Sequence, residues 1–171
     1  MKKFLAVLLA AVALVSAVAC GGDKYADLKI SNINGFGQNL LKEVTFDRQL
    51  DVLDDTEFAA KQLKLDTDKL NLVDGKPEMF YAVSAASPEA VFVIGAKDAA
   101  AAKSISSGPI KDWIKFNIEG YNDYGPTHVP KLESCINMTA GRYAFLIVSN
   151  DNKAAKDVLT GLLDTSIKIH D

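Results

Sequence analysis

Histidine and cysteine are both scarce in this sequence, with two residues of each among 171. His128 and His170 belong to no Cys/His cluster with the spacing of a metal site. The Gly-x-Ser-x-Gly and His-Glu-x-x-His motifs of hydrolases are missing as well. We therefore expect no metal, no cofactor and no catalytic residue, and a protein that is not an enzyme. Carboxylates that meet only in the fold leave a small envelope hydrolase as an alternative.

An excess of positive charge is also missing. The chain has 19 basic and 22 acidic residues, a formal charge of −3. Lys2 and Lys3 lie in a segment that we expect to be removed, which leaves 17 basic residues against 22 acidic ones, or −5. An acidic domain lacks the cationic surface that nucleic acids require, so we expect no nucleic-acid partner.

The sequence contains no apolar run of the length that a membrane-spanning helix normally has. After Lys2 and Lys3, residues 4–15 are apolar and residues 16–19 are small. This run falls short of the roughly 20 residues that a membrane-spanning helix needs, so a permanent anchor is the weaker interpretation. A charged start, a short apolar core and small residues are typical of a signal peptide, which we predict at residues 1–19.

Residues 17–20, Ala-Val-Ala-Cys, resemble the bacterial lipobox, in which the cysteine receives a diacylglyceryl group and becomes the mature N-terminus. Ala17 departs from the Leu, Val or Ile that usually stands there, and Ala-Val-Ala also suits ordinary signal peptidase. We predict lipidation of Cys20 and a location on the outer face of the cell membrane, with secretion as the alternative. Cys135 then has no disulfide partner, and we expect it to be buried as a small apolar residue.

The rest of the chain is expected to form one domain. Residues 20–37 are polar and contain several glycines, which predicts a lipidated tether, and residues 38–171 are long enough to form a single α+β domain. Asp66-Thr67-Asp68 invites a calcium site, but Leu70 and Asn71 occupy positions where the calcium loop needs an oxygen ligand and a glycine.

Two apolar runs indicate a repeated strand and helix. Residues 89–95 lead into Asp98 and a run of alanines, and residues 144–149 lead into Asp151 and a second alanine-containing segment. Phe92 and Phe145 are equivalent positions 53 residues apart. Both runs predict a buried strand that is followed by a helix with an aspartate as its N-cap.

Each repeat has a further strand before it, at residues 79–83 and 136–139, joined by a short turn. We therefore predict a four-stranded antiparallel sheet, built from two β-β-α units, with helices packed on one face. Helices near residues 40–44 and from Asp54 onward are expected to precede the sheet. The segment 106–109, Ser-Ser-Gly-Pro, should break or kink the first repeat helix before a second helical segment.

Four aromatic residues lie in this second segment: Trp113, Phe116, Tyr121 and Tyr124. They are candidates for a ligand groove, but aromatics at helical spacing are more often part of a core, and we favour the core.

Residues 131–151 and 89–98, taken together, resemble a family of Gram-positive surface lipoproteins known only as a domain of unknown function. The resemblance spans about residues 40–163. It implies a lipoprotein whose domain has no assigned catalytic residue. The leading hypothesis is thus a non-catalytic module that binds an unidentified protein, peptide or envelope component and contacts the membrane through the lipid on Cys20. A solute-binding accessory lipoprotein is a further alternative.

Overall fold

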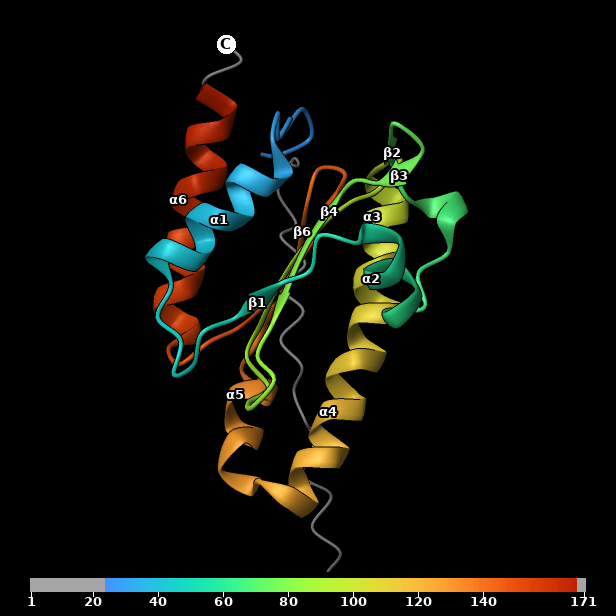
Figure 1. Cartoon of the computed structure of the whole chain (residues 1–171). Helices are drawn as coiled ribbons and strands as arrows, with labels where there is room; N and C mark the ends of the chain where they lie inside the picture. The colour runs from blue at the N-terminus through green and yellow to red at the C-terminus, as the bar shows by residue number, and fades with distance from the viewer. Residues whose placement is uncertain (1–23, 169–171) are drawn as a thin grey trace, which may run out of the picture.

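The computed structural model describes residues 24–168. The predicted signal peptide at residues 1–19 and the predicted lipidation site Cys20 lie outside the described residues, as does His170. Within the described part of the chain, no helix has the length and apolar character needed to cross a membrane. Figure 1 shows a sheet that stands between two layers of helices.

The chain forms six α-helices and seven strands over residues 24–168. The helices are α1 (Ile33–Glu43), α2 (Thr56–Gln62), α3 (Ala99–Ile105), α4 (Lys111–Tyr124), α5 (Val129–Glu133) and α6 (Asn152–Lys168). Shorter helical segments are η1 (Thr67–Lys69), the π-helical η2 (Ser106–Ile110) and η3 (Pro126–His128). The strands are β1 (Asp51–Val52), β2 (Leu72–Val73), β3 (Lys76–Pro77), β4 (Met79–Val83), β5 (Ala90–Gly95), β6 (Ile136–Ala140) and β7 (Tyr143–Val148).

The main sheet is antiparallel and has five strands in the order β1-β4-β5-β7-β6. The mixed α+β class and the two hairpins, β4 with β5 and β6 with β7, are confirmed. The prediction of four strands is wrong, because β1 adds a fifth strand at one edge. A strand of two residues has no apolar alternation for the sequence to display.

Helices cover both faces of this sheet, so the prediction of helices on one face is also wrong. One core cluster contains residues of α2, α3, η2, α4 and α5, and the other contains residues of α1 and α6. Figure 1 shows α3 and α4 on one side and α1 and α6 on the other. The central strands β5 and β7 are buried along their whole length, as a sheet covered on both faces requires.

The register of β5 and β7 explains why the two repeat helices lie on opposite faces. Phe92 pairs with Leu146, whereas Phe145 pairs with Val93. Paired residues of antiparallel strands point to the same face, so the equivalent Phe92 and Phe145 point to opposite faces. Each helix packs on the aromatic residue of its own strand, α3 on the side of Phe92 and α6 on the side of Phe145.

The stretch before α1 packs on the domain. Leu28 and Ile30 are buried in the core beside α1 and α6, and α1 itself begins at Ile33. The backbone N–H of Ile30 donates a hydrogen bond of 3.0 Å to the Tyr143 hydroxyl. The predicted tether over residues 20–37 is therefore wrong for residues 24–37. Although this segment is polar on average, the apolar side chains of Leu28, Ile30, Ile33 and Phe36 dock in the core.

Aspartates begin several helices, as expected. The Asp98 carboxylate accepts a hydrogen bond of 2.7 Å from the N–H of Ala101 and caps α3. In α2 the cap is Asp55, which accepts from Phe58 N–H, and the predicted cap at Asp54 is off by one residue. Only α1 precedes the whole sheet, since α2 lies between β1 and β4.

The helical chain continues from α3 to α4 through the π-helical segment η2, which contains Pro109. Proline lacks an N–H group and its ring crowds the preceding turn of an α-helix, and a wider turn relieves both problems. Asn137 on β6 binds this segment through two hydrogen bonds. The Asn137 amide donates one of 3.0 Å to the Ser106 carbonyl, and the Ser106 hydroxyl donates one of 2.6 Å to Asn137 Oδ1. The helix is thus modified at the predicted place without being broken.

Candidate functional site

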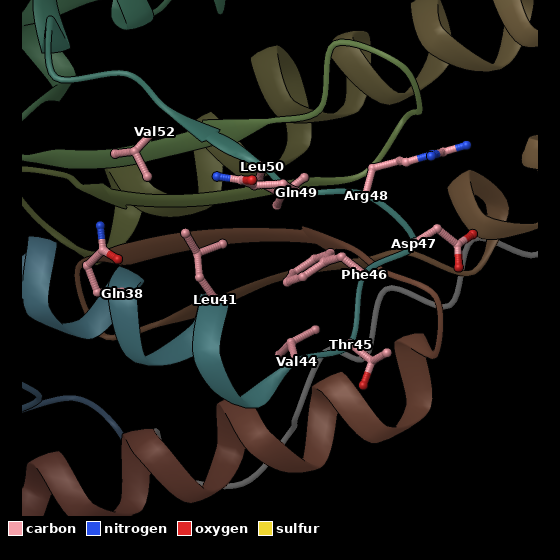
Figure 2. Close-up of a pocket in the computed structure, with 10 residues that line it drawn as sticks. All are labelled: Gln38, Leu41, Val44, Thr45, Phe46, Asp47, Arg48, Gln49, Leu50 and Val52. Carbon is pink, nitrogen blue, oxygen red and sulfur yellow. The ribbon is translucent and has the colours of Figure 1, made fainter.

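A groove of about 610 Å³ lies between the C-terminal half of α1 and the edge strand β1 (Figure 2). We call it the α1–β1 groove. It is lined by Gln38, Leu41, Val44, Thr45, Phe46, Asp47, Arg48, Gln49, Leu50 and Val52. Seven of these residues belong to the consecutive segment 44–50, which connects α1 to β1. The shape of the groove therefore depends on how this connection is fixed to the sheet.

The floor of the groove is apolar. Leu41, Phe46 and Val52 are partly buried and pack against the core beneath α1. Figure 2 shows these three side chains around one space, with Arg48 pointing away from it. The rim is polar and exposed, and includes Gln38 and Gln49. An apolar floor with amide groups at its rim suits a ligand that has both apolar side chains and hydrogen-bonding groups.

A buried carboxylate fixes the 44–50 connection. Glu89, only 1% exposed, accepts hydrogen bonds from the backbone N–H of Asp47 at 2.9 Å and of Arg48 at 3.2 Å. The Ser87 hydroxyl adds a third donor at 3.1 Å. A carboxylate without partners would be too costly to bury, so these bonds account for the place of Glu89 in the structure. Two backbone N–H groups of the groove segment are thereby held at the end of the sheet.

Lys131 on α5 completes this cluster. Its ammonium group lies 3.1 Å from Glu89 Oε1 and also binds the carboxylate of Asp47. Burial lowers the pKa of Lys131, but the hydrogen bonds to Asp47 and Glu89 outweigh that effect, so its pKa lies above the usual value. Lys131 is therefore a fixed positive charge near neutral pH. A charged lysine cannot serve as a general base or nucleophile, which favours a structural role for the cluster.

A second set of bonds fixes the groove segment from the opposite side. The backbone N–H of Asn150 donates a hydrogen bond of 3.1 Å to the carbonyl of Thr45. Next to it, the side chain of Asn152 accepts from the N–H of Ser149 at 2.8 Å and donates to the carbonyl of Lys131 at 2.8 Å. The connections after α1 and after β7 and the helix α5 therefore meet in one network, which fixes the segment that lines the groove.

The four aromatic residues of α4 divide into two pairs. Trp113 packs edge-on against Phe92 with ring centroids 5.1 Å apart, and Tyr121 packs against His128 at 5.2 Å. Phe116 and Tyr124 are 75% and 92% exposed. The predicted core role is confirmed for Trp113 and Tyr121 and wrong for Phe116 and Tyr124. None of the four residues lines the α1–β1 groove.

Cys135 is partly buried and packs against the core beneath α3 and α4. Burial raises its pKa from 9.0 to about 12, so the thiol is protonated and unreactive at neutral pH. The Asp66 carboxylate accepts a hydrogen bond of 3.1 Å from the N–H of Asp68 and begins η1. Among residues 24–168, no group of three or more His, Cys, Asp or Glu side chains is arranged to hold a metal ion.

The sequence did not reveal the α1–β1 groove. Leu41 lies in residues 40–44, which the sequence predicts only as a helix, and Phe46 stands alone between polar residues. The sequence places Glu89 at the start of a predicted strand and gives no sign that its carboxylate is buried and needs partners. Those partners are 41 and 42 residues away in the chain, which no local pattern records.

Comparison with known proteins gives no match: no family model, no curated protein and no solved structure corresponds to this chain. The resemblance to a family of surface lipoproteins stays a prediction. A functional interpretation consequently depends on the geometry of the groove and on the features of the sequence.

Proposed function

We propose that this protein is a membrane-anchored bacterial lipoprotein that acts on the outer face of the cell membrane as a non-catalytic binding module. The α1–β1 groove is its binding site, and an extended segment of another protein is its ligand. The observation that carries the proposal is the groove, with the apolar side chains of Leu41, Phe46 and Val52 on its floor and its 44–50 segment fixed to the sheet by hydrogen bonds.

The edge strand β1 supports the choice of an extended peptide. β1 is the last strand of the sheet on this side, and it pairs only with β4 within the described residues. The N–H of Leu53 points toward β4, where it donates a hydrogen bond of 2.9 Å to the carbonyl of Tyr81. Backbone groups alternate in direction along a strand, so those of Val52 point away from β4. A peptide strand can pair there while an apolar side chain enters the groove.

Crosslinking in intact cells, followed by purification of the anchored protein, tests the proposed site. Leu41→Arg places a charge on the groove floor and should abolish capture of the partner. Phe116→Arg is the control, because Phe116 is exposed on α4 and outside the groove. Equal capture by the wild type, Leu41→Arg and Phe116→Arg would exclude the groove as the binding site.

The predicted lipid on Cys20 supports the location, and it is tested separately. Two acyl chains anchor a protein firmly, at roughly 0.8 kcal/mol per buried CH₂ group, whereas one chain binds only weakly. Cys20→Ala should leave the precursor uncut or release the protein into the medium. Mass spectrometry of the N-terminal peptide of the wild type should show a diacylated Cys20. An unmodified Cys20 on protein free in the medium would identify a secreted protein instead.

A further inference from the structure

The first described residues that contact the rest of the domain lie only a few positions after the predicted lipidation site, Cys20. Lys24 forms an ion pair of 2.6 Å with Asp164 on α6, and the Tyr25 hydroxyl donates 3.0 Å to the same carboxylate. Leu28 follows as a buried residue. Four residue steps separate Cys20 from Lys24, and they span at most about 14 Å at about 3.5 Å per residue. If Cys20 carries the lipid, this part of the domain cannot move far from the membrane.

This entry point lies at the end of the sheet where β6 turns into β7. Gly141 in that turn has a positive φ of 52°, and a Cβ added to it would clash with the carbonyl oxygen of Tyr25. The hydroxyl of Tyr143, the first residue of β7, binds the backbone of Ile30. Figure 1 shows the start of the described chain beside the C-terminal end of α6, at the same end of the molecule.

The small hairpin of β2 and β3 lies at this end as well. The N–H of Ala96 donates a hydrogen bond of 2.8 Å to the carbonyl of Arg142 in the β6–β7 turn. The N–H of Asn71 donates one of 2.9 Å to the carbonyl of Gly95. β2 begins at the next residue, and its two side chains, Leu72 and Val73, are 49% and 53% exposed. Two exposed aliphatic residues therefore lie in the hairpin at the end that contains the chain entry.

We propose that this end of the domain faces the bilayer that holds the lipid of Cys20, with Leu72 and Val73 in contact with the interfacial region of the membrane. The inference rests on the proposed lipidation. The available reach of about 14 Å is shorter than β5, whose six residues extend about 17 Å at about 3.3 Å per step, so the anchored domain cannot turn over. Glu89 immediately precedes β5 at its other end, and the segment of the α1–β1 groove that binds Glu89 then lies at the end of the sheet that is farther from the membrane.

Quenching of tryptophan fluorescence by brominated acyl chains tests this orientation. Trp113 is the only native tryptophan, so Trp113→Phe removes the tryptophan emission of the wild-type sequence and leaves only that of an introduced reporter. Val73→Trp reports on the β2–β3 hairpin, and Tyr124→Trp, at the exposed C-terminal end of α4, is the matched control. The full lipidated protein is reconstituted into vesicles of brominated phosphatidylcholine and phosphatidylglycerol. We expect strong loss of emission for Val73→Trp and none for Tyr124→Trp.

A longer spacer tests whether the short link between the lipid and the domain is what holds the β2–β3 hairpin at the membrane. Ten Gly and Ser residues inserted after Gly22 should remove most of the quenching of Val73→Trp, because the domain can then leave the surface. Equal quenching of the two reporters, absence of quenching from Val73→Trp, or quenching unaffected by the insert would each overturn the inference. Mass spectrometry of the same sample distinguishes the two proposals: an unmodified Cys20 overturns the anchorage and the inference together, whereas a diacylated Cys20 without quenching overturns the inference alone.

Discussion

The two ends of the main sheet each contain a carboxylate that binds neighbouring segments, and they differ in how completely that carboxylate is enclosed. Glu89 precedes β5, and its side chain is fully buried with Lys131 as its cationic partner. Glu78 precedes β4 at the other end, and its side chain is 11% exposed with Arg142 as its partner. Arg142 is itself more exposed than Lys131, at 30% against 16% of the side chain.

The difference shows which end has a fixed shape. Glu89 binds the connection between α1 and β1, the turn before β5, and α5, so three separate segments meet on one buried group. Glu78 binds Asn71 at 2.8 Å and Arg142 at 2.7 Å, and water can replace part of those bonds. The more enclosed end is the one with the α1–β1 groove, and the more open end is the one where the described chain begins.

The largest expected effect is that of Glu89→Ala. This change removes the acceptor for the N–H groups of Asp47 and Arg48 and one partner of Lys131, and should lower the free energy of unfolding by about 3–5 kcal/mol. Glu78→Ala, the matched change at the other end, should cost about 1–3 kcal/mol. Urea denaturation measures both losses. A smaller loss for Glu89→Ala than for Glu78→Ala would contradict the comparison of the two ends.

Gly141→Ala probes the end near the chain entry. The positive φ and the clash with the Tyr25 carbonyl should together cost about 2–3 kcal/mol. Gly75→Ala is the control, because Gly75 also has a positive φ, of 79°, but a Cβ there would meet no atom within 4 Å. Thermal unfolding should show a smaller loss for Gly75→Ala. Equal losses would mean that the packing of Tyr25 on the β6–β7 turn contributes nothing to stability.

The smallest expected effect concerns Cys135, which precedes β6 at the Glu89 end. In the unfolded chain its thiol loses a proton above about pH 9, while in the folded protein it stays protonated up to about pH 12. The unfolded state then binds fewer protons, so the free energy of unfolding falls as pH rises through this window, by up to about 1.4 kcal/mol per pH unit. Cys135→Ala should lose less stability than the wild type between pH 8 and pH 10. Identical pH profiles in urea denaturation would show that the thiol is not enclosed.

The sequence predicted the elements of this fold better than their arrangement. The hairpins, the cap at Asp98 and the helical state of α4 follow from short-range patterns, which is why they are confirmed. The face of each helix and the strand β1 were missed. A one-residue offset in register moves Phe145 to the other face, and this offset comes from how β5 and β7 pair, not from either strand alone.

For the candidate site the same limit holds more strictly. The sequence by itself determined the scarcity of Cys and His, the acidic charge and the predicted signal and lipidation segment, because these depend on composition and on adjacent residues. Only the tertiary structure decided that Glu89 binds Asp47 and Arg48, that Lys131 joins them, and that a groove forms beside β1. Those contacts connect residues about 40 positions apart, and the fold must supply them because a carboxylate buried without partners would be too costly.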